Sequence, residues 1–436
     1  MMKISEMPKY DDYVDSGVEW LGRVPASWEL TRLGTRFNER RSKVSDIDYP
    51  ALSVTKKGVL PQLDNAAKTK DGDNRKLVKE GDFVINSRSD RKGSSGVSDR
   101  DGSVSLINIV LKPKGIHPKF SEHLLKSHAF IEEYYRVGRG IVADLWTTRY
   151  DEMRTITISV PSLEEQTRIA NFLDKKTALI DEAISIKEKQ INLLKEHKQI
   201  IIQQAVTQGL DPNVPMKDSG VDWIGDIPEH WEVVPLKRLA VLSPSVKVSN
   251  RKSKELVTFL AMEKVSTDGF IDQDTLMPIC DVSQGFTVFN RGDVIVAKIT
   301  PCFENGKSAW LNNLQTEFGY GSIEFHVLRC GQRIIGSFLY LIVSSPLFLN
   351  AGEAMMTGSA GQKRVPSSFI QNFPTAIPGV AEQEKIVSKV KELFSQIDVV
   401  VASTVNQIEK LKEYKTTLIN SAVTGKIKIT PEMVEQ

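Results

Sequence analysis

A segment rich in arginine, serine and glycine offers the clearest chemistry in this chain. It reads Asn86-Ser87-Arg88-Ser89-Asp90-Arg91-Lys92-Gly93-Ser94-Ser95-Gly96 and contains no apolar side chain. Arginine can donate two parallel hydrogen bonds to guanine O6 and N7, and serine or asparagine can contact phosphate or base edges. The preceding residues 81–86 predict a strand that would hold the segment at its end. The candidate DNA contacts are Asn86, Ser87, Arg88, Ser89, Arg91 and Lys92, and a solvated loop is the plain alternative.

Four shorter basic segments carry weaker signals. Lys298 and Thr300 directly follow a second strand-like stretch, residues 292–297, and so match the first segment in position. The others are a loop with Arg251, Lys252 and Lys254, a loop with Gln362, Lys363 and Arg364, and the pair Lys56 and Lys57. For the two loops a solvated surface is as good an interpretation as DNA contact, and the lysine pair is weaker still.

Enzyme and metal-site motifs are missing where their chemistry would require them. Gly306-Lys307-Ser308 looks like the end of a phosphate-binding loop, but Pro301 stands where G-x-x-x-x-G-K-S needs its first glycine. The sequence has no G-x-G-x-x-G and no Pro-Pro pair, so the Asn-Pro-Pro-aromatic motif of amino-methyltransferases is absent. The six histidines lack metal-ligand spacing, and the three cysteines form no C-x-x-C pair. We therefore expect no catalytic residue, metal or cofactor in this chain.

Charge and hydropathy narrow the class of protein. The chain has 57 Lys and Arg against 55 Asp and Glu, and this net charge of +2 is low for a protein that depends on non-specific DNA affinity. Residues 15–160 hold 25 basic against 20 acidic side chains, whereas residues 218–377 hold 14 against 16. Residues 218–377 are slightly acidic as a whole, so any DNA-contacting face among them must be a local basic patch. No apolar run approaches the roughly 20 residues of a membrane span, and the first residues lack an apolar signal core, so we expect a cytoplasmic protein.

An internal repeat determines the expected domain organisation. Residues 15–28 return as residues 218–231, each with Asp-Ser-Gly-Val-(Glu/Asp)-Trp-(Leu/Ile)-Gly followed by Pro-x-x-Trp. The offset between the copies drifts from 203 near residue 15 to 211 near residue 81, and is constant at 217 over residues 161–207. Such a pattern is typical of a rigid frame that carries domains of variable length. We expect the repeated tryptophans to be core anchors: Trp20, Trp28, Trp223 and Trp231.

Two long helices are predicted where the offset is constant, at residues 163–207 and 380–424. Both stretches lack proline and glycine, and both repeat an apolar residue every three or four positions. Examples are Ile180, Ile184, Ile191 and Leu194 in the first, and Ile397, Val401, Val405 and Ile408 in the second. A helix of about 45 residues is about 65 Å long, and one apolar stripe of that length needs a partner helix. We expect the two helices to pack against each other, antiparallel.

The repeated phrase resembles the opening of each target-recognition domain in specificity subunits of type I restriction-modification systems. The Pro-x-x-x-Glu-Gln-x-(Arg/Lys)-Ile entry to each helix and residues 292–307 are similar to the same family, and the resemblance covers essentially the whole chain. It implies a subunit that binds double-stranded DNA and has no activity alone. Its partners would be two methyltransferase subunits and two restriction or translocase subunits. S-adenosylmethionine, ATP and magnesium would then belong to those partners.

The expected architecture is α+β, with two mixed α/β target-recognition domains in pseudo-twofold repeat separated by two long antiparallel coiled-coil helices. Each domain would read one half of a split DNA target. Two alternatives stay open: a coiled-coil scaffold that binds proteins only, and a standalone nuclease or methyltransferase with a degenerate site. The expected boundaries are an N-terminal segment at 1–14, target-recognition domain 1 at 15–162, a central long helix at 163–208, a linker at 209–217, target-recognition domain 2 at 218–379, a distal long helix at 380–424 and a C-terminal tail at 425–436.

Overall fold

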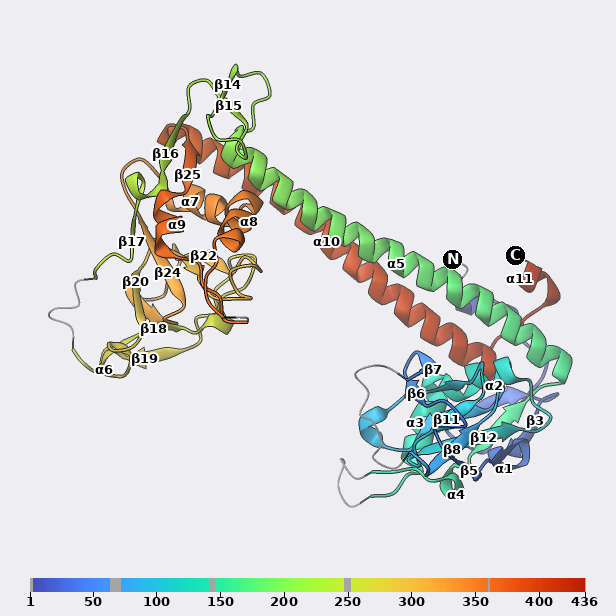
Figure 1. Ribbon diagram of the computed structural model, residues 1–436. Helices are drawn as coiled ribbons and strands as arrows, with labels where there is room; N and C mark the ends of the chain where they lie inside the picture. Colours follow the sequence, from blue (N-terminus) through green and yellow to red (C-terminus); the bar gives the residue numbers. More distant parts are fainter. Residues whose placement is uncertain (1–2, 63–71, 141–145, 247–251, 360, 436) are drawn as a thin grey trace. The chain divides into compact units, whose positions relative to one another are not determined.

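The computed structural model describes residues 3–62, 72–140, 146–246, 252–359 and 361–435 (Figure 1). The chain divides into two compact units, Met1–Glu188 with Val405–Gln436, and Lys189–Thr404. Each unit contains one mixed α/β domain and a part of both long helices, α5 (Leu163–Thr207) and α10 (Val380–Val423). The expected fold class and both long helices are confirmed.

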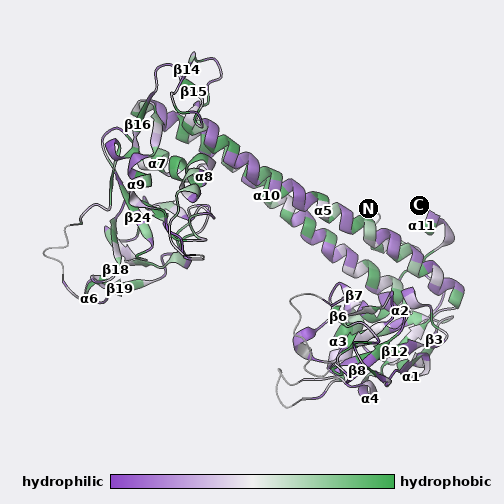
Figure 2. Ribbon diagram, in the orientation of Figure 1, coloured by the Kyte–Doolittle hydropathy of each residue, from purple (hydrophilic) through white to green (hydrophobic). Residues whose placement is uncertain are grey.

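The two long helices run antiparallel within each unit. In the first unit, Lys415 pairs with Asp181 at 2.7 Å, and Lys187 donates to Gln407 at 2.5 Å. In the second unit, Lys198 forms an ion pair with Asp398. Polar and apolar residues alternate along both helices (Figure 2), as expected for helices that bury one stripe and expose the rest.

The buried stripe follows the expected apolar residues with one exception. On α5, Ile180, Ile184 and Ile201 are buried, but on α10 Val405 is 42% exposed and Thr404 is buried in its place. The prediction for Val405 was wrong because two consecutive steps of four residues rotate a side chain by about 80° away from the stripe. The Thr404 hydroxyl donates to the Val400 carbonyl oxygen at 2.8 Å. This bond satisfies the hydroxyl inside the apolar stripe.

The first domain is built on an antiparallel sheet of order β10-β9-β12-β4. These strands are Ser95–Val97, Phe83–Asn86, Asn108–Pro113 and Phe37–Glu39. Two helices follow β12, and Ser127 separates them: its hydroxyl caps the second helix by accepting from Phe130 N. The other elements are α2 (Pro118–Lys126), α3 (His128–Arg136), the sheet β11-β8-β5 (Gly102–Val104, Arg75–Val78, Lys43–Val44) and the hairpin β6-β7 (Leu52–Thr55, Gly58–Pro61).

The second domain repeats this sheet as β22-β21-β24-β17, with strands Ser308–Trp310, Val294–Ala297, Phe325–Cys330 and Ala240–Leu242. Two helices again follow, α7 (Gly336–Val343) and α8 (Pro346–Ala354). Its other sheet, of order β19-β18-β23-β20, contains a parallel pair and has no counterpart of the same topology among the described strands of the first domain. The drift in offset therefore arises largely outside the repeated sheet. The strands of this other sheet are Leu276–Pro278, Leu256–Leu260, Phe318–Gly321 and Thr287–Asn290.

A two-stranded ladder leads from each domain into its long helix. The strand β13 (Thr157–Val160) pairs with β3 (Glu29–Arg32) just before α5, and β25 (Pro374–Ile377) pairs with β16 (Glu232–Pro235) just before α10. Of the tryptophans beside these ladders, Trp28 and Trp231 are buried as expected, whereas Trp223 is 41% exposed and packs against Phe373. The remaining elements are the hairpins β1-β2 (Tyr13–Asp15, Arg23–Pro25) and β14-β15 (Met216–Asp218, Asp226–Pro228), and the short helices α1 (Leu33–Arg36), α4 (Tyr150–Met153), α6 (Ile279–Val282), α9 (Ser367–Asn372) and α11 (Pro431–Glu435).

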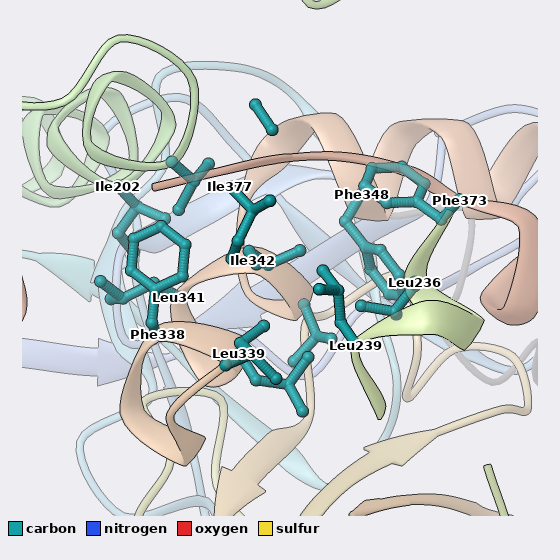
Figure 3. Packing of buried hydrophobic residues seen from close by; sticks show 14 of the residues in the cluster. Ile202, Leu236, Leu239, Phe338, Leu339, Leu341, Ile342, Phe348, Phe373 and Ile377 are labelled. Carbon is teal, nitrogen blue, oxygen red and sulfur yellow. The ribbon is translucent and has the colours of Figure 1, made fainter. Parts of the chain in front are cut away.

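A large apolar core lies in the second unit, where α5 and α10 meet the domain. Phe338 and Ile342 from α7 point toward Ile202 of α5 and Ile377 (Figure 3). Phe348 from α8 lies beside Phe373, with ring centroids 4.9 Å apart. Burial of each such side chain stabilises the fold by about 1.5–3 kcal/mol, so the end of α5 is fixed to the domain by packing.

Candidate nucleic-acid interface

The arginine- and serine-rich segment of the first domain is an ordered connection between β9 and β10. Asn86 and Ser87 are buried at the end of β9, and the Asn86 side-chain oxygen accepts from Arg88 N at 3.0 Å. A short helical turn, Ser89–Arg91, follows, and Ser94 N donates to the Arg91 carbonyl at 2.9 Å. The backbone of this loop is therefore held by its own hydrogen bonds.

Three cations of this loop are exposed, and they differ in their partners. Lys92 pairs with Glu132 at 2.7 Å and lies over the Tyr135 ring, 5.5 Å from its centroid. Among the described residues, Arg91 pairs with the neighbouring Asp90 at 3.6 Å. No residue within the described part of the chain pairs with the Arg88 guanidinium, whereas the Arg88 carbonyl accepts from the Tyr135 hydroxyl at 3.1 Å. The backbone of Arg88 is thus fixed while its guanidinium is available to a ligand.

A second segment, which sequence reasoning missed, lies beside this loop. Arg139 and Thr147 form two backbone hydrogen bonds of 2.9 Å with each other, and Thr148 N donates to the Ser87 carbonyl at 3.0 Å. Thr147 also forms an isolated bridge with Arg88. Arg139 is thereby placed near the loop with its side chain 83% exposed. The glycines on either side of Arg139 were the only local sign of such a connection.

In the second domain the structure brings together two candidates that are more than 60 positions apart in sequence. Lys298 and Thr300 follow β21, and both Thr300 N and its hydroxyl donate to the Lys363 carbonyl at 3.0 Å. Val365 N donates to the Lys298 carbonyl at 2.8 Å, and Ile299 forms an isolated bridge with Arg364. Lys298 and Thr300 therefore form one surface with a second group of exposed side chains: Gln362, Lys363 and Arg364.

The two domains use the same backbone frame for these loops. Ser87 N donates to the Ile107 carbonyl in the first domain, and Lys298 N donates to the Glu324 carbonyl in the second. The bridges of Thr147 with Arg88 and Arg139 correspond to those of Arg364 with Ile299 and Thr357. Ile107 and Thr147 in the first domain thus occupy the positions of Glu324 and Arg364 in the second, so one frame carries two different sets of side chains.

The Arg364 guanidinium is bound to the Glu324 carboxylate. Arg364 Nε donates to Glu324 Oε2 at 2.9 Å, and Nη2 donates to Oε1 at 2.7 Å. Because of these bonds, the pKa of Glu324 is lowered and that of Arg364 is raised. The carboxylate is half-buried, with 18% of its side chain exposed, whereas 48% of the arginine side chain is exposed.

The remaining candidates do not join these surfaces through described contacts. Lys56 and Lys57 are exposed in the turn between β6 and β7. Lys252 and Lys254 are exposed on either side of Ser253, and the Ser253 carbonyl accepts from Cys280 N of α6. These residues lie next to the sheet β19-β18-β23-β20. Arg251 lies outside the described residues.

Known proteins resemble this chain in both sequence and fold. Residues 32–196, which include most of the first domain and the first part of α5, match the family described as "Type I restriction modification DNA specificity domain". A specificity subunit from Methanocaldococcus jannaschii, of the type I restriction enzyme MjaVIII, is 24% identical over 93% of this chain and 94% of its own. Over these residues the chain is therefore similar to the type I restriction-modification specificity family.

Specificity subunits from Escherichia coli are more similar but over a shorter stretch. That of the type I restriction enzyme EcoAI is 37% identical over 45% of this chain, and that of EcoEI is 36% identical over 44%. Each match spans 33% of the relative's own length, so the chain covers about a third of these longer subunits.

Solved structures share the fold of this chain. The structure described as the HsdS subunit from Thermoanaerobacter tengcongensis covers 93% of this chain and 98% of its own, with a TM-score of 0.51 and 16% identity. A structure from work on assembly and conformational transition of the type I R-M system covers 92% and 98%, with a TM-score of 0.67 and 15% identity.

The lysine of the rejected phosphate-loop motif has a structural partner. Lys307 Nζ donates to the Met262 carbonyl at 2.9 Å and so contributes to the packing of the domain. Among the residues that the structure describes, no group of three or more His, Cys, Asp or Glu is placed to hold a metal ion. Within the same residues, no helix is both long and apolar enough to span a bilayer.

Proposed function

We propose that this chain reads a split DNA sequence, with each α/β domain contacting one half-site. The observation that carries this proposal is the repeated loop frame, which presents Arg88 and Arg91 in one domain and Lys298 and Arg364 in the other. Two structurally equivalent frames with different side chains suit two half-sites of different sequence. The matched family, whose description is a DNA specificity domain, supports the same proposal.

Affinity and selectivity would come from different groups. Lysines such as Lys92 and Lys363 act as point charges toward phosphate, whereas arginine forks can distinguish guanine from other bases. The first domain carries the larger basic excess, 25 against 20, and so contributes more of the electrostatic attraction. With a net charge of +2, the isolated chain binds DNA weakly.

The long helices would bind partner subunits. Four apolar residues of α5 lie at seven-residue intervals and are at least half exposed: Leu179, Ile186, Leu193 and Ile200. Seven-residue spacing keeps side chains on nearly one helix face, so this α5 stripe is suited to a partner helix. At the matching positions of α10 stand polar residues: Gln396, Ser403, Lys410 and Thr417. This difference makes α5 the principal docking helix.

The proposed partners are two methyltransferase subunits and two restriction or translocase subunits. They would supply the chemistry, with S-adenosylmethionine, ATP and magnesium, while this chain is non-catalytic and directs them to the target in the cytoplasm. The domain boundaries given above, with recognition domains at 15–162 and 218–379, remain part of this proposal.

Co-expression with a type I methyltransferase subunit, followed by methylation-sensitive sequencing of the host genome, tests the proposed function. Methylation should occur at one motif with two short half-sites and an unread spacer of fixed length. Methylation without sequence preference would contradict DNA reading. It would favour the alternative of a coiled-coil scaffold that binds proteins only. Turnover of S-adenosylmethionine or DNA cleavage by the purified chain alone would favour the enzyme alternative.

A further inference from the structure

The ion pair between Glu324 and Arg364 leaves one defined edge of the guanidinium unoccupied. The carboxylate takes the edge formed by Nε and one N–H of Nη2. Nη1 and the second N–H of Nη2 form the opposite edge, and no described residue accepts from Nη1. With 48% of the side chain exposed, this edge is accessible beside Lys298 and Lys363.

Two parallel N–H groups match the two acceptors that guanine presents in the major groove, O6 and N7. We propose that Arg364 contacts a guanine in the half-site of the second domain and that Glu324 is the positioning residue for its guanidinium. This inference rests on the proposed function. It further names the residue that reads the base, the base that is read, and the carboxylate that orients the reading side chain. Both carboxylate oxygens of Glu324 accept from Arg364, so the role assigned to Glu324 is to position the guanidinium.

Orientation by a half-buried carboxylate reduces the cost of binding. A free arginine side chain loses rotamer entropy when it is fixed on binding, and a guanidinium that is already held avoids part of that loss. Glu324 is well placed for this role, since its own backbone carbonyl accepts from Lys298 N and its side chain is only 18% exposed.

The first domain supports this assignment by contrast. On the same backbone frame it has Ile107 at the position of Glu324 and Thr147 at the position of Arg364. Neither residue is charged. The first domain therefore lacks both members of the Glu324–Arg364 ion pair. An ion pair needed only to hold the frame together would be required in both domains.

The test uses the full chain with its methyltransferase partner and duplexes that carry the methylation motif found for the wild type. Each base pair of both half-sites is replaced in turn, and binding is measured for the wild type, Arg364→Ala, Arg364→Lys and Glu324→Gln. Arg333→Ala is the matched control, because Arg333 is also 48% exposed and paired with a glutamate, Glu232, away from the loops.

Arg364→Ala should reduce discrimination at a single G·C pair of the second half-site by about 5- to 150-fold. Arg364→Lys should lose the same discrimination while it keeps the charge, Glu324→Gln should lose part of it at the same base pair, and Arg333→Ala should lose none. Unchanged reading of the first half-site shows that each variant is folded.

Several outcomes would overturn the inference while the proposed function stands. These are a second half-site without a G·C pair, equal weakening on all sequences by Arg364→Ala, or a Glu324→Gln variant identical to wild type. If the wild type itself shows no sequence preference, the proposed function fails with it, so the two failures are distinguishable.

Discussion

Gln166 and Gln383 make the same two hydrogen bonds at the start of the two long helices. Gln166 Nε2 donates to the Pro161 carbonyl at 2.8 Å, and its Oε1 accepts from His117 N at 2.7 Å. Gln383 Nε2 donates to the Pro378 carbonyl at 2.9 Å, and its Oε1 accepts from Ile335 N at 3.0 Å. Each amide therefore ties the first turn of a long helix to the residue that caps a helix of its own domain, α2 in the first and α7 in the second.

Replacing either glutamine by leucine should destabilise its unit. Both side chains are buried, and leucine leaves a backbone donor and acceptor without partners, at about 1–3 kcal/mol for each group. Chemical denaturation followed by circular dichroism measures the loss. Gln204→Leu is the control, because Gln204 is exposed on the same helix α5 and should change stability by less than about 0.5 kcal/mol. Equal effects at the buried and exposed positions would contradict the anchoring role.

Arg40 and Arg41 are adjacent, but we expect very different effects on stability. Arg40 binds both carboxylate oxygens of Asp82, at 2.6 and 3.0 Å, and Asp82 is only 2% exposed. Arg40→Met leaves this carboxylate buried with Lys79 N as its remaining donor and should cost about 3–5 kcal/mol. Arg41→Met removes an arginine that is 69% exposed, and Glu39 keeps Lys76 as its partner, so this variant should lose much less stability. Urea unfolding of the two variants provides the comparison, and similar midpoints would refute it.

His326 should make the second unit less stable in mild acid. Burial lowers its pKa below the ordinary value of about 6.5, while Nε2 hydrogen-bonds the Val365 carbonyl at 3.0 Å. Between the folded and unfolded pKa values only the unfolded chain binds the proton. The contribution is therefore complete above about pH 6.5 and is lost as the pH falls below it.

Thermal unfolding of the wild type and His326→Gln between pH 8 and pH 5 isolates this effect. The charged neighbours Lys298 and Glu324 are present in both proteins, so their own titration cancels in the difference. The stability of the wild type should fall more steeply than that of the variant. Parallel curves would show that His326 does not titrate in this range.

The α5 stripe should determine partner binding. Ile186→Glu or Leu193→Glu places a charge on an exposed apolar site, 58% and 64% exposed in the wild type, and should weaken co-purification of the methyltransferase subunit at least tenfold. Asn192→Glu introduces the same charge at an exposed polar site of α5, about 120° around the helix from Ile186, and is expected to have no effect. Size-exclusion chromatography with light scattering reports the assembly, and unchanged assembly of both stripe variants would remove the docking proposal.

Arg88 is the candidate base contact of the first domain. Arg88→Ala should cost about 1–3 kcal/mol on the cognate target and relax selectivity in the first half-site alone. Arg100→Ala removes an exposed arginine of the same domain, paired with Asp99, and should leave selectivity intact. Uniform weakening on specific and random duplexes would identify Arg88 as a phosphate contact instead.

Sequence patterns sufficed for the long helices because helix formation depends on local periodicity and on the absence of glycine and proline. Val405 was misplaced for a local reason as well, since its spacing of four fits a helix turn but not the seven-residue stripe. The repeat also placed β9 and β21 correctly, because each begins just after a Gly-Asp turn.

The composition of the candidate site was harder to predict. Arg139 and Thr147 reach the first loop only through backbone pairing across long sequence separations, which no local pattern encodes. Glu324 was not considered because an acid alone argues against DNA contact. Its role emerges only when β24 places it beside Arg364.

The shared loop frame has a consequence for how this chain can evolve. The backbone hydrogen bonds of Ser87 and Lys298 are made by main-chain atoms and are the same whether the neighbouring position carries isoleucine or glutamate. Side chains on the frame can therefore be exchanged with little loss of folding stability. If the chain reads DNA as proposed, one or two substitutions on the frame would change the sequence that is read and leave the backbone that supports the reading side chains unchanged.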